Sequence, residues 1–152
     1  MTVAIGDLVP DTDPDNAPFW AGLADGTIVV QQCLQCGRRR FPRLPGCPYC
    51  GAADWKDVTV AGTGTVYSWV RVHRPMTSHV SEGDVPYVIA TVDLDGGGRM
   101  FGRLLDDNGA VAVGDRVGPV FVPHNGWTEL AFSVEPAAAP ARSTEPGTEV
   151  TR

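Results

Sequence analysis

Two short stretches decide the fold, and each holds a pair of cysteines: Cys33-Leu34-Gln35-Cys36-Gly37 and Cys47-Pro48-Tyr49-Cys50-Gly51. Two residues between the cysteines of a tight turn let both thiolates point at one metal ion. Two such turns complete a tetrahedral shell. The glycine after each pair allows the tight backbone turn that lets amides donate to the sulfurs. We therefore predict one structural Zn²⁺ ion, bound by Cys33, Cys36, Cys47 and Cys50.

Iron in a rubredoxin-like site would have the same four-thiolate geometry. Zinc is favoured because nothing else in the sequence points to electron transfer. Four thiolates fill the shell and leave no position for water or substrate, so the ion is expected to stabilise the fold rather than to catalyse. The spacing between the two pairs is slightly shorter than is usual for zinc ribbons, and the two flanking glycines make up for it.

The composition of the 152 residues favours a folded, β-rich protein. The chain is 43% hydrophobic, enough for a real core, and its 18 glycines and 13 prolines favour turns and short strands. A formal net charge of −6 argues against nucleic-acid binding. Met1 to Asp15 lacks the basic start and apolar run of a signal peptide, so we expect a cytoplasmic protein whose cysteines stay reduced.

Alternating apolar residues outward from the cysteines predict a mainly β fold: an N-terminal helix, a four-cysteine zinc ribbon and a five-stranded OB-fold barrel. An incomplete sandwich is the alternative. The ribbon strands are predicted at Thr27–Gln32, Arg40–Leu44 and Trp55–Val60. The barrel strands are predicted at Thr65–His73, Tyr87–Leu94, Arg99–Leu105, Arg116–Val122 and Thr128–Val134.

The expected organisation has four parts: a flexible arm at 1–13, the helix and ribbon at 14–61, the OB-fold domain at 62–136 and a disordered tail at 137–152. The helix is predicted over 14–25, capped by Asp13, with Pro14 at its first position and Gly26 at its end. Its apolar face, Phe19, Trp20 and Leu23, is a candidate for docking on a partner. The alternative is that this face packs on the body of the protein.

Two basic groups are candidates for binding CoA or a partner. One is Arg38, Arg39 and Arg40 beside the cysteines, and the other is Arg71, His73 and Arg74 at the end of the first barrel strand. Arginine pairs well with phosphate or with acidic side chains. A solvated strand end is the alternative for the second group. Trp69 and Trp127 could stack on an adenine but are more often core residues. No histidine lies in a recognisable catalytic motif, so no catalytic residue is assigned.

The chain resembles the acyl-CoA-associated OB-fold family, a domain of unknown function with a rubredoxin-like N-terminal zinc ribbon. The matching residues run from about Pro14 to Pro136. They are Phe19-Trp20, Gln32-Cys33, Cys36-Gly37, Phe41-Pro42, Cys47 to Gly51, Gly64 to Ser68, Val72-His73-Arg74, Pro86-Tyr87, Ala90 to Leu94, Phe101 to Leu104 and Gly114 to Val117. The cysteine pairs are shared by many ribbons, whereas their coupling to Val-His-Arg-Pro and Gly-Asp-x-Val is more specific.

The resemblance implies a non-catalytic accessory subunit that binds and activates a thiolase-fold acyl-CoA enzyme. Similar proteins accompany acetoacetyl-CoA thiolase and HMG-CoA synthase assemblies, and also lipid-transfer-type aldolases and hydratases that shorten steroid side chains, as in cholesterol degradation. The leading hypothesis is a retro-aldol lyase as partner, in a hetero-oligomer with acyl-CoA near the interface. Three alternatives remain: a hydratase, thiolase or HMG-CoA synthase assembly, a free-standing acyl-CoA carrier, and a single-strand nucleic-acid binder.

Overall fold

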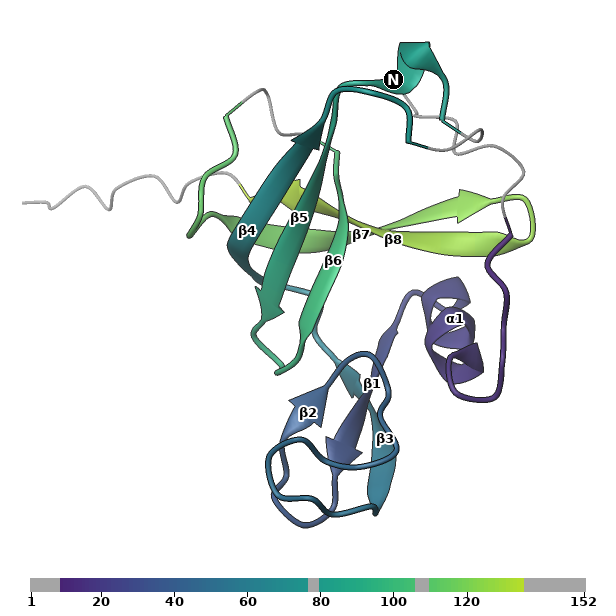
Figure 1. The fold of residues 1–152 in the computed structure, drawn as a ribbon, viewed down its shortest axis with the longest axis vertical. Helices are drawn as coiled ribbons and strands as arrows, with labels where there is room; N and C mark the ends of the chain where they lie inside the picture. Colours follow the sequence, from purple (N-terminus) through teal and green to yellow (C-terminus); the bar gives the residue numbers. More distant parts are fainter. Residues whose placement is uncertain (1–8, 77–79, 106–109, 136–152) are drawn as a thin grey trace, which may run out of the picture.

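A computed structural model describes residues 9–76, 80–105 and 110–135. These residues fold into one α-helix, a three-stranded sheet and a closed five-stranded barrel, as Figure 1 shows. The predicted mainly β fold with helix, ribbon and OB-like barrel is therefore confirmed. Most of the expected arm and all of the expected tail lie outside the described residues. Within those residues, no helix is long and apolar enough to span a bilayer.

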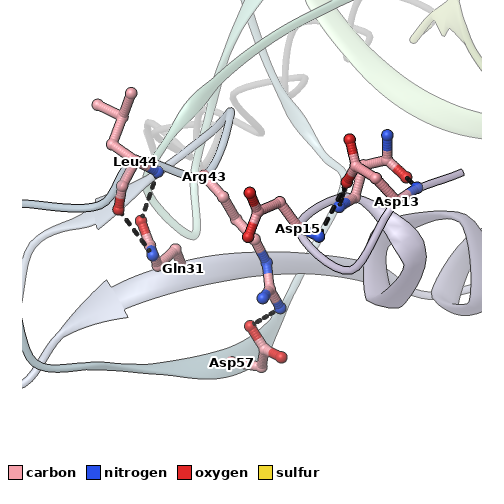
Figure 2. A network of polar contacts seen from close by, with 7 residues as sticks. Asp13, Asp15, Gln31, Arg43, Leu44 and Asp57 are labelled. Carbon is pink, nitrogen blue, oxygen red and sulfur yellow. Dashed lines mark hydrogen bonds and ion pairs between the residues drawn. The ribbon is translucent and has the colours of Figure 1, made fainter.

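Helix α1 (Ala17–Ala24) begins three residues later than predicted. The Oδ1 atom of Asp13 accepts hydrogen bonds from the amides of Asp15 and Asn16, both at 2.8 Å (Figure 2). This local turn competes with helix formation, as short polar side chains often do. Asp13 therefore closes a turn before the helix instead of capping it, and Pro14 is not the first helical residue.

The end of α1 follows the prediction. Gly26 has a φ of 70°, a left-handed conformation that favours glycine. The amide of Thr27 then donates to the carbonyl of Gly22 at 2.8 Å, which closes the last turn in the manner of a Schellman motif. The chain turns back at this point and enters the ribbon sheet.

The ribbon sheet has the order β2-β1-β3, with β1 (Ile28–Cys33) central between β2 (Arg39–Arg40) and β3 (Trp55–Val60). The prediction for β3 is confirmed, whereas the second strand ends at Arg40 and does not extend to Leu44 as predicted. Pro42 has no amide proton to donate to a ladder, so pairing stops at Arg40. The loop is held instead by the buried Gln31 side chain, which donates to and accepts from the Leu44 backbone at 3.1 Å each (Figure 2).

The barrel has the strand order β4-β5-β6-β8-β7. Its strands are β4 (Gly64–Val72), β5 (Tyr87–Leu94), β6 (Arg99–Leu104), β7 (Arg116–His124) and β8 (Trp127–Val134), with a short 3-10 helix at Glu82–Asp84 in the long connection. Each strand lies within two residues of its prediction. Four of the five contacts are antiparallel, and the barrel closes where β6 and β8 meet in parallel at Leu104 and Phe132.

One apolar cluster joins all the parts. Leu23 of α1 and Val30 of β1 belong to the same buried cluster as Val66, Met100 and Phe132 of the barrel. Because α1 packs on β8 as well as on β1, the helix covers the barrel at its ribbon end (Figure 1). The helix and ribbon are therefore held to the barrel by core packing and not only by the connecting chain.

Gly64 is required where β4 enters the barrel. A Cβ atom there would lie 2.4 Å from the Asp93 carbonyl oxygen and 2.6 Å from a methyl of Val92. Gly64→Ala is expected to lower the free energy of unfolding by about 1–3 kcal/mol, because this backbone cannot move aside. Urea denaturation measures it. Gly46→Ala is the matched control, since nothing lies within 4 Å of its Cβ position. Equal stability of the two variants would contradict the expectation.

Candidate metal centre and docking surfaces

The sulfurs of Cys33, Cys36, Cys47 and Cys50 form one cluster, all within 4.8 Å of one another. The Sγ atoms of Cys33 and Cys50 are 3.7 Å apart, and those of Cys36 and Cys47 are 3.6 Å apart. These separations are too long for disulfides. A tetrahedral site with Zn–S bonds of about 2.3 Å places its sulfurs about 3.8 Å apart. The four thiolates therefore form a metal site whose dimensions fit zinc.

Two equivalent turns position the four sulfurs. The amide of Gly37 donates to the Cys33 carbonyl at 3.1 Å, and the amide of Gly51 donates to the Cys47 carbonyl at 2.8 Å. Both glycines have positive φ values, 71° and 77°, as their place in the turns requires. The sequence predicted that the glycine amides help to support the sulfurs. Instead they close the turns onto carbonyl oxygens.

The amides that reach the sulfurs come from within the Cys-x-x-Cys loops or from just after them. The amide of Cys36 contributes most to lowering the pKa of Cys33, which falls to about 6. The amide of Ala52 lowers the pKa of Cys50, but burial and the neighbouring sulfurs outweigh it and raise that pKa to about 11. Four crowded thiols thus resist losing all their protons together. A divalent cation compensates the thiolate charges and releases the protons.

The three ribbon arginines do not share one exposed surface. Arg38 stacks its guanidinium over the Tyr49 ring at 4.3 Å. The Nη1 atom of Arg39 donates to the Gly96 carbonyl of the barrel at 2.6 Å. Arg40 is only 5% exposed, and its guanidinium has no hydrogen-bond partner within the described residues. Each arginine therefore has a different local role, although they are consecutive in sequence.

The second basic group lies at the far end of the barrel. Strand β4 runs away from the ribbon, and Arg71, His73 and Arg74 lie at its end (Figure 1). Nine strand residues extend over roughly 30 Å, so one small anion cannot contact both basic groups. His73 and Arg74 are exposed, and Arg71 lies 6.0 Å from the Trp69 ring. These residues could contact a ligand or partner separately from the ribbon.

The apolar face of α1 packs largely on the protein itself. Leu23 is 1% exposed, so its assignment as a docking residue is wrong because it is part of the core. Phe19 packs on Phe41 with 4.6 Å between ring centroids, and Trp20 packs edge-on against Trp127 at 5.9 Å. Phe19 and Trp20 are half-buried and keep some exposed surface. The alternative interpretation of this face, packing on the body, describes it better.

A buried charged network in the barrel was not predicted. Arg103 donates through Nε and Nη2 to the two carboxylate oxygens of Glu129 at 2.6 and 2.7 Å, and His124 lies 2.9 Å from the same carboxylate. Burial opposes ionisation of Glu129, but Arg103 and then His124 outweigh it and lower the pKa of Glu129. His124 also stacks on Trp127 with ring centroids 4.5 Å apart. No motif marks this pairing, because it depends on the β6–β8 contact.

The outer surface of β4 and β6 carries exposed apolar side chains, namely Tyr67, Val70 and Phe101, which are 52%, 59% and 69% exposed. Arg99 lies over the Tyr67 ring at 3.5 Å and binds both carboxylate oxygens of Asp93. These two strands flank β5 in the barrel, and exposed apolar groups gathered on one face of a sheet are typical of interaction sites. The sequence alternation places such residues on one side of a strand, but it does not show that this side stays uncovered.

Family comparisons agree with this two-part architecture. Residues 20–56 match the model of the ChsH2 rubredoxin-like zinc ribbon domain, and residues 57–122 match that of the ChsH2 C-terminal OB-fold domain. A DUF35 domain-containing scaffold protein of Methanothermobacter thermautotrophicus is 32% identical over 96 residues, which cover 62% of this chain and 71% of that protein. The chain belongs to the DUF35 family.

Two longer relatives match this chain over part of their own length. One is a probable enoyl-CoA hydratase alpha subunit of Thermomonospora curvata, 38% identical over 63% of this chain and 29% of that protein. The other is a 3-oxo-4,17-pregnadiene-20-carboxyl-CoA hydratase alpha subunit of Mycobacterium tuberculosis, 34% identical over 81% of this chain and 39% of that protein. The chain thus spans well under half the length of these hydratase subunits.

A solved structure described as an Ltp2–ChsH2(DUF35) aldolase contains a chain with the same fold. The TM-score is 0.71 at 31% identity, and the match covers 83% of this chain and 98% of that one. The ribbon, helix and barrel together therefore reproduce nearly the whole of that chain.

Proposed function

We propose that this chain is a non-catalytic accessory subunit that binds and activates a thiolase-fold acyl-CoA enzyme. The partner enzyme would be a retro-aldol lyase of steroid side-chain degradation. The observation that carries this proposal is the match to 98% of a chain from an Ltp2–ChsH2 aldolase. The hydratase alpha subunits favour a second candidate, an accessory role in an acyl-CoA hydratase.

The metal would serve the architecture of this subunit. All four cysteines of the sequence gather in one cluster, so four thiolates fill a tetrahedral shell around zinc and leave no position for substrate. The reacting groups would then belong to the partner. This chain would hold the partner in its active shape and contribute to the CoA entrance. Contacts to CoA or to the partner are assigned to Arg38, Arg39, Arg40, Arg71, His73 and Arg74.

The exposed surface of β4 and β6 is the docking surface that we propose for the partner. Tyr67, Val70 and Phe101 supply apolar area there, and Arg99 supplies a charged rim. Interfaces commonly combine an apolar centre rich in aromatic residues with a polar edge. The exposed parts of Phe19 and Trp20 would extend this contact beside the helix.

The assignment is tested by co-expressing the chain with a candidate aldolase or with a candidate hydratase partner and measuring co-purification and turnover. The purified single chain should cleave no steroid acyl-CoA, whereas the correct pair should be active. Phe101→Asp should weaken the complex at least tenfold, because it places a charge in the apolar centre. Val113→Asp is the matched control, since Val113 is 67% exposed but lies outside the proposed surface. Turnover by the single chain would refute the accessory role.

A further inference from the structure

Arg40, at the junction of ribbon and barrel, has a buried positive charge that no described residue compensates. Its Nε, Nη1 and Nη2 atoms are all buried and have no hydrogen-bond partner within the residues that the structure describes. A guanidinium cannot give up its proton near neutral pH, so burial cannot neutralise it. A buried charge without a partner is costly and is normally compensated by an anion or an acceptor. Arg40 therefore calls for an acceptor that the described chain does not provide.

Arg40 lines a pocket of about 490 Å³ that has a surplus of positive charge. Arg39 and Arg99 line the same pocket, and Asp93 is the carboxylate among its lining residues. Both Asp93 oxygens are already bound to Arg99, at 2.6 and 3.0 Å. Three guanidinium groups against one carboxylate leave two positive charges uncompensated. The overall negative charge of the chain makes this local surplus more unusual.

The neighbouring groups are held in place around the pocket. Arg39 is fixed by its hydrogen bond to the Gly96 carbonyl, and Arg99 by Asp93 and the Tyr67 ring. Tyr49 lines this pocket and also an adjoining one of about 440 Å³, which Arg38 and Arg39 line as well. Donors that are already oriented bind an anion with less loss of side-chain freedom.

We propose that this pocket binds a phosphate group, with Arg39 as its main donor and the buried positive charge of Arg40 beside it. A phosphate dianion would balance the two surplus charges, whereas a carboxylate would balance only one. The planar guanidinium fork also suits phosphate oxygens. The site draws on one of the basic groups assigned above and adds Arg99 and Tyr49 from outside it. Phosphate binding can be measured on the single chain. A chain that binds no phosphate would leave the accessory-subunit proposal standing, and a chain without a partner enzyme could still bind phosphate.

Titration calorimetry of the zinc-loaded full chain with inorganic phosphate, at constant ionic strength, tests the site. Saturable binding is expected, and acetate should bind at least tenfold more weakly because it carries one charge. Arg40→Gln and Arg39→Gln should each weaken phosphate binding about tenfold or more. Lys56→Gln removes one positive charge from an exposed position of the ribbon and should change the affinity less than twofold.

Thermal unfolding gives a second readout. Phosphate should raise the midpoint of the wild-type protein but not that of Arg40→Gln, which should be the more stable protein in phosphate-free buffer because it lacks the uncompensated charge. If Arg40→Gln does not fold, the side-chain Nε–H resonance of Arg40 in the wild-type protein must shift on phosphate addition. Absence of saturable binding, equal binding of acetate, or unchanged phosphate binding in Arg40→Gln would each overturn the proposal.

Discussion

Cys33→Ser is expected to release the metal and unfold the ribbon. Cys33 is buried at the end of β1, and its sulfur lies 3.7 Å from that of Cys50. A structural zinc site contributes on the order of 10 kcal/mol to folding, and a sheet with a two-residue edge strand buries too little apolar surface to replace it. Metal analysis should find the zinc lost, and circular dichroism should show a lower and broader thermal transition.

Leu34→Ser is the matched control for this prediction, because Leu34 neighbours Cys33 in the same turn but is 57% exposed. It should keep one zinc ion per chain and a thermal midpoint near that of the wild type. A strong chelator should convert the wild-type protein to the state of Cys33→Ser, and added zinc should reverse it. A Cys33→Ser protein that retains zinc and full stability would show that the cluster does not hold the fold.

Arg103→Met should destabilise the barrel by about 3–5 kcal/mol, the usual cost of leaving one member of a buried ion pair uncompensated. The side chains of Arg103 and Glu129 are only 7% and 10% exposed, so water cannot replace the lost partner. His124 would remain as a single donor to Glu129. Urea denaturation at neutral pH measures the loss. Replacing both residues, Arg103→Met with Glu129→Leu, should recover most of it, because no buried charge is then left.

The pH dependence of stability gives an independent check of this pair. In the wild-type protein the lowered pKa of Glu129 contributes stability above its unfolded value of about 4.3, and this stability is lost as the pH falls through the lower folded value. In Arg103→Met, burial raises the pKa of Glu129 instead. The defect should therefore be largest at neutral pH and shrink as the solution is acidified. A defect that does not change with pH would show that lost packing, and not charge, is the cause.

The strands and the metal ligands were predictable because their signals are local. Alternation of apolar residues placed all five barrel strands within two residues, and the Cys-x-x-Cys spacing identified four ligands that the fold does gather. The errors also have local causes that the pattern does not display. The helix begins later than predicted because the Asp13 side chain closes a turn before it. At Leu44, hydrogen bonds to the Gln31 side chain take the place of strand pairing. Both depend on which acceptor a polar side chain selects.

The contacts and the burial of the charged residues were not predictable from the sequence. Arg38, Arg39 and Arg40 look equivalent in the chain, yet one stacks on a ring, one binds a carbonyl 57 residues away and one is buried. Arg103 and Glu129 meet only because β6 and β8 lie side by side at the closure of the barrel. Such pairings depend on register and closure, which single-sequence patterns do not contain.

The turn that joins β5 to β6 packs against the ribbon. Because of this contact, we expect the ribbon and the barrel to unfold together and not as separate units. A Cβ atom on Gly96 would lie 2.8 Å from Val60, and one on Gly97 would lie 3.3 Å from Arg39. With Leu23 also in the shared core, a protein cut at Gly62 would leave two fragments, each with a bare apolar side. Heating should therefore produce a single calorimetric peak whose van't Hoff and calorimetric enthalpies agree, although the chain matches two separate domain models.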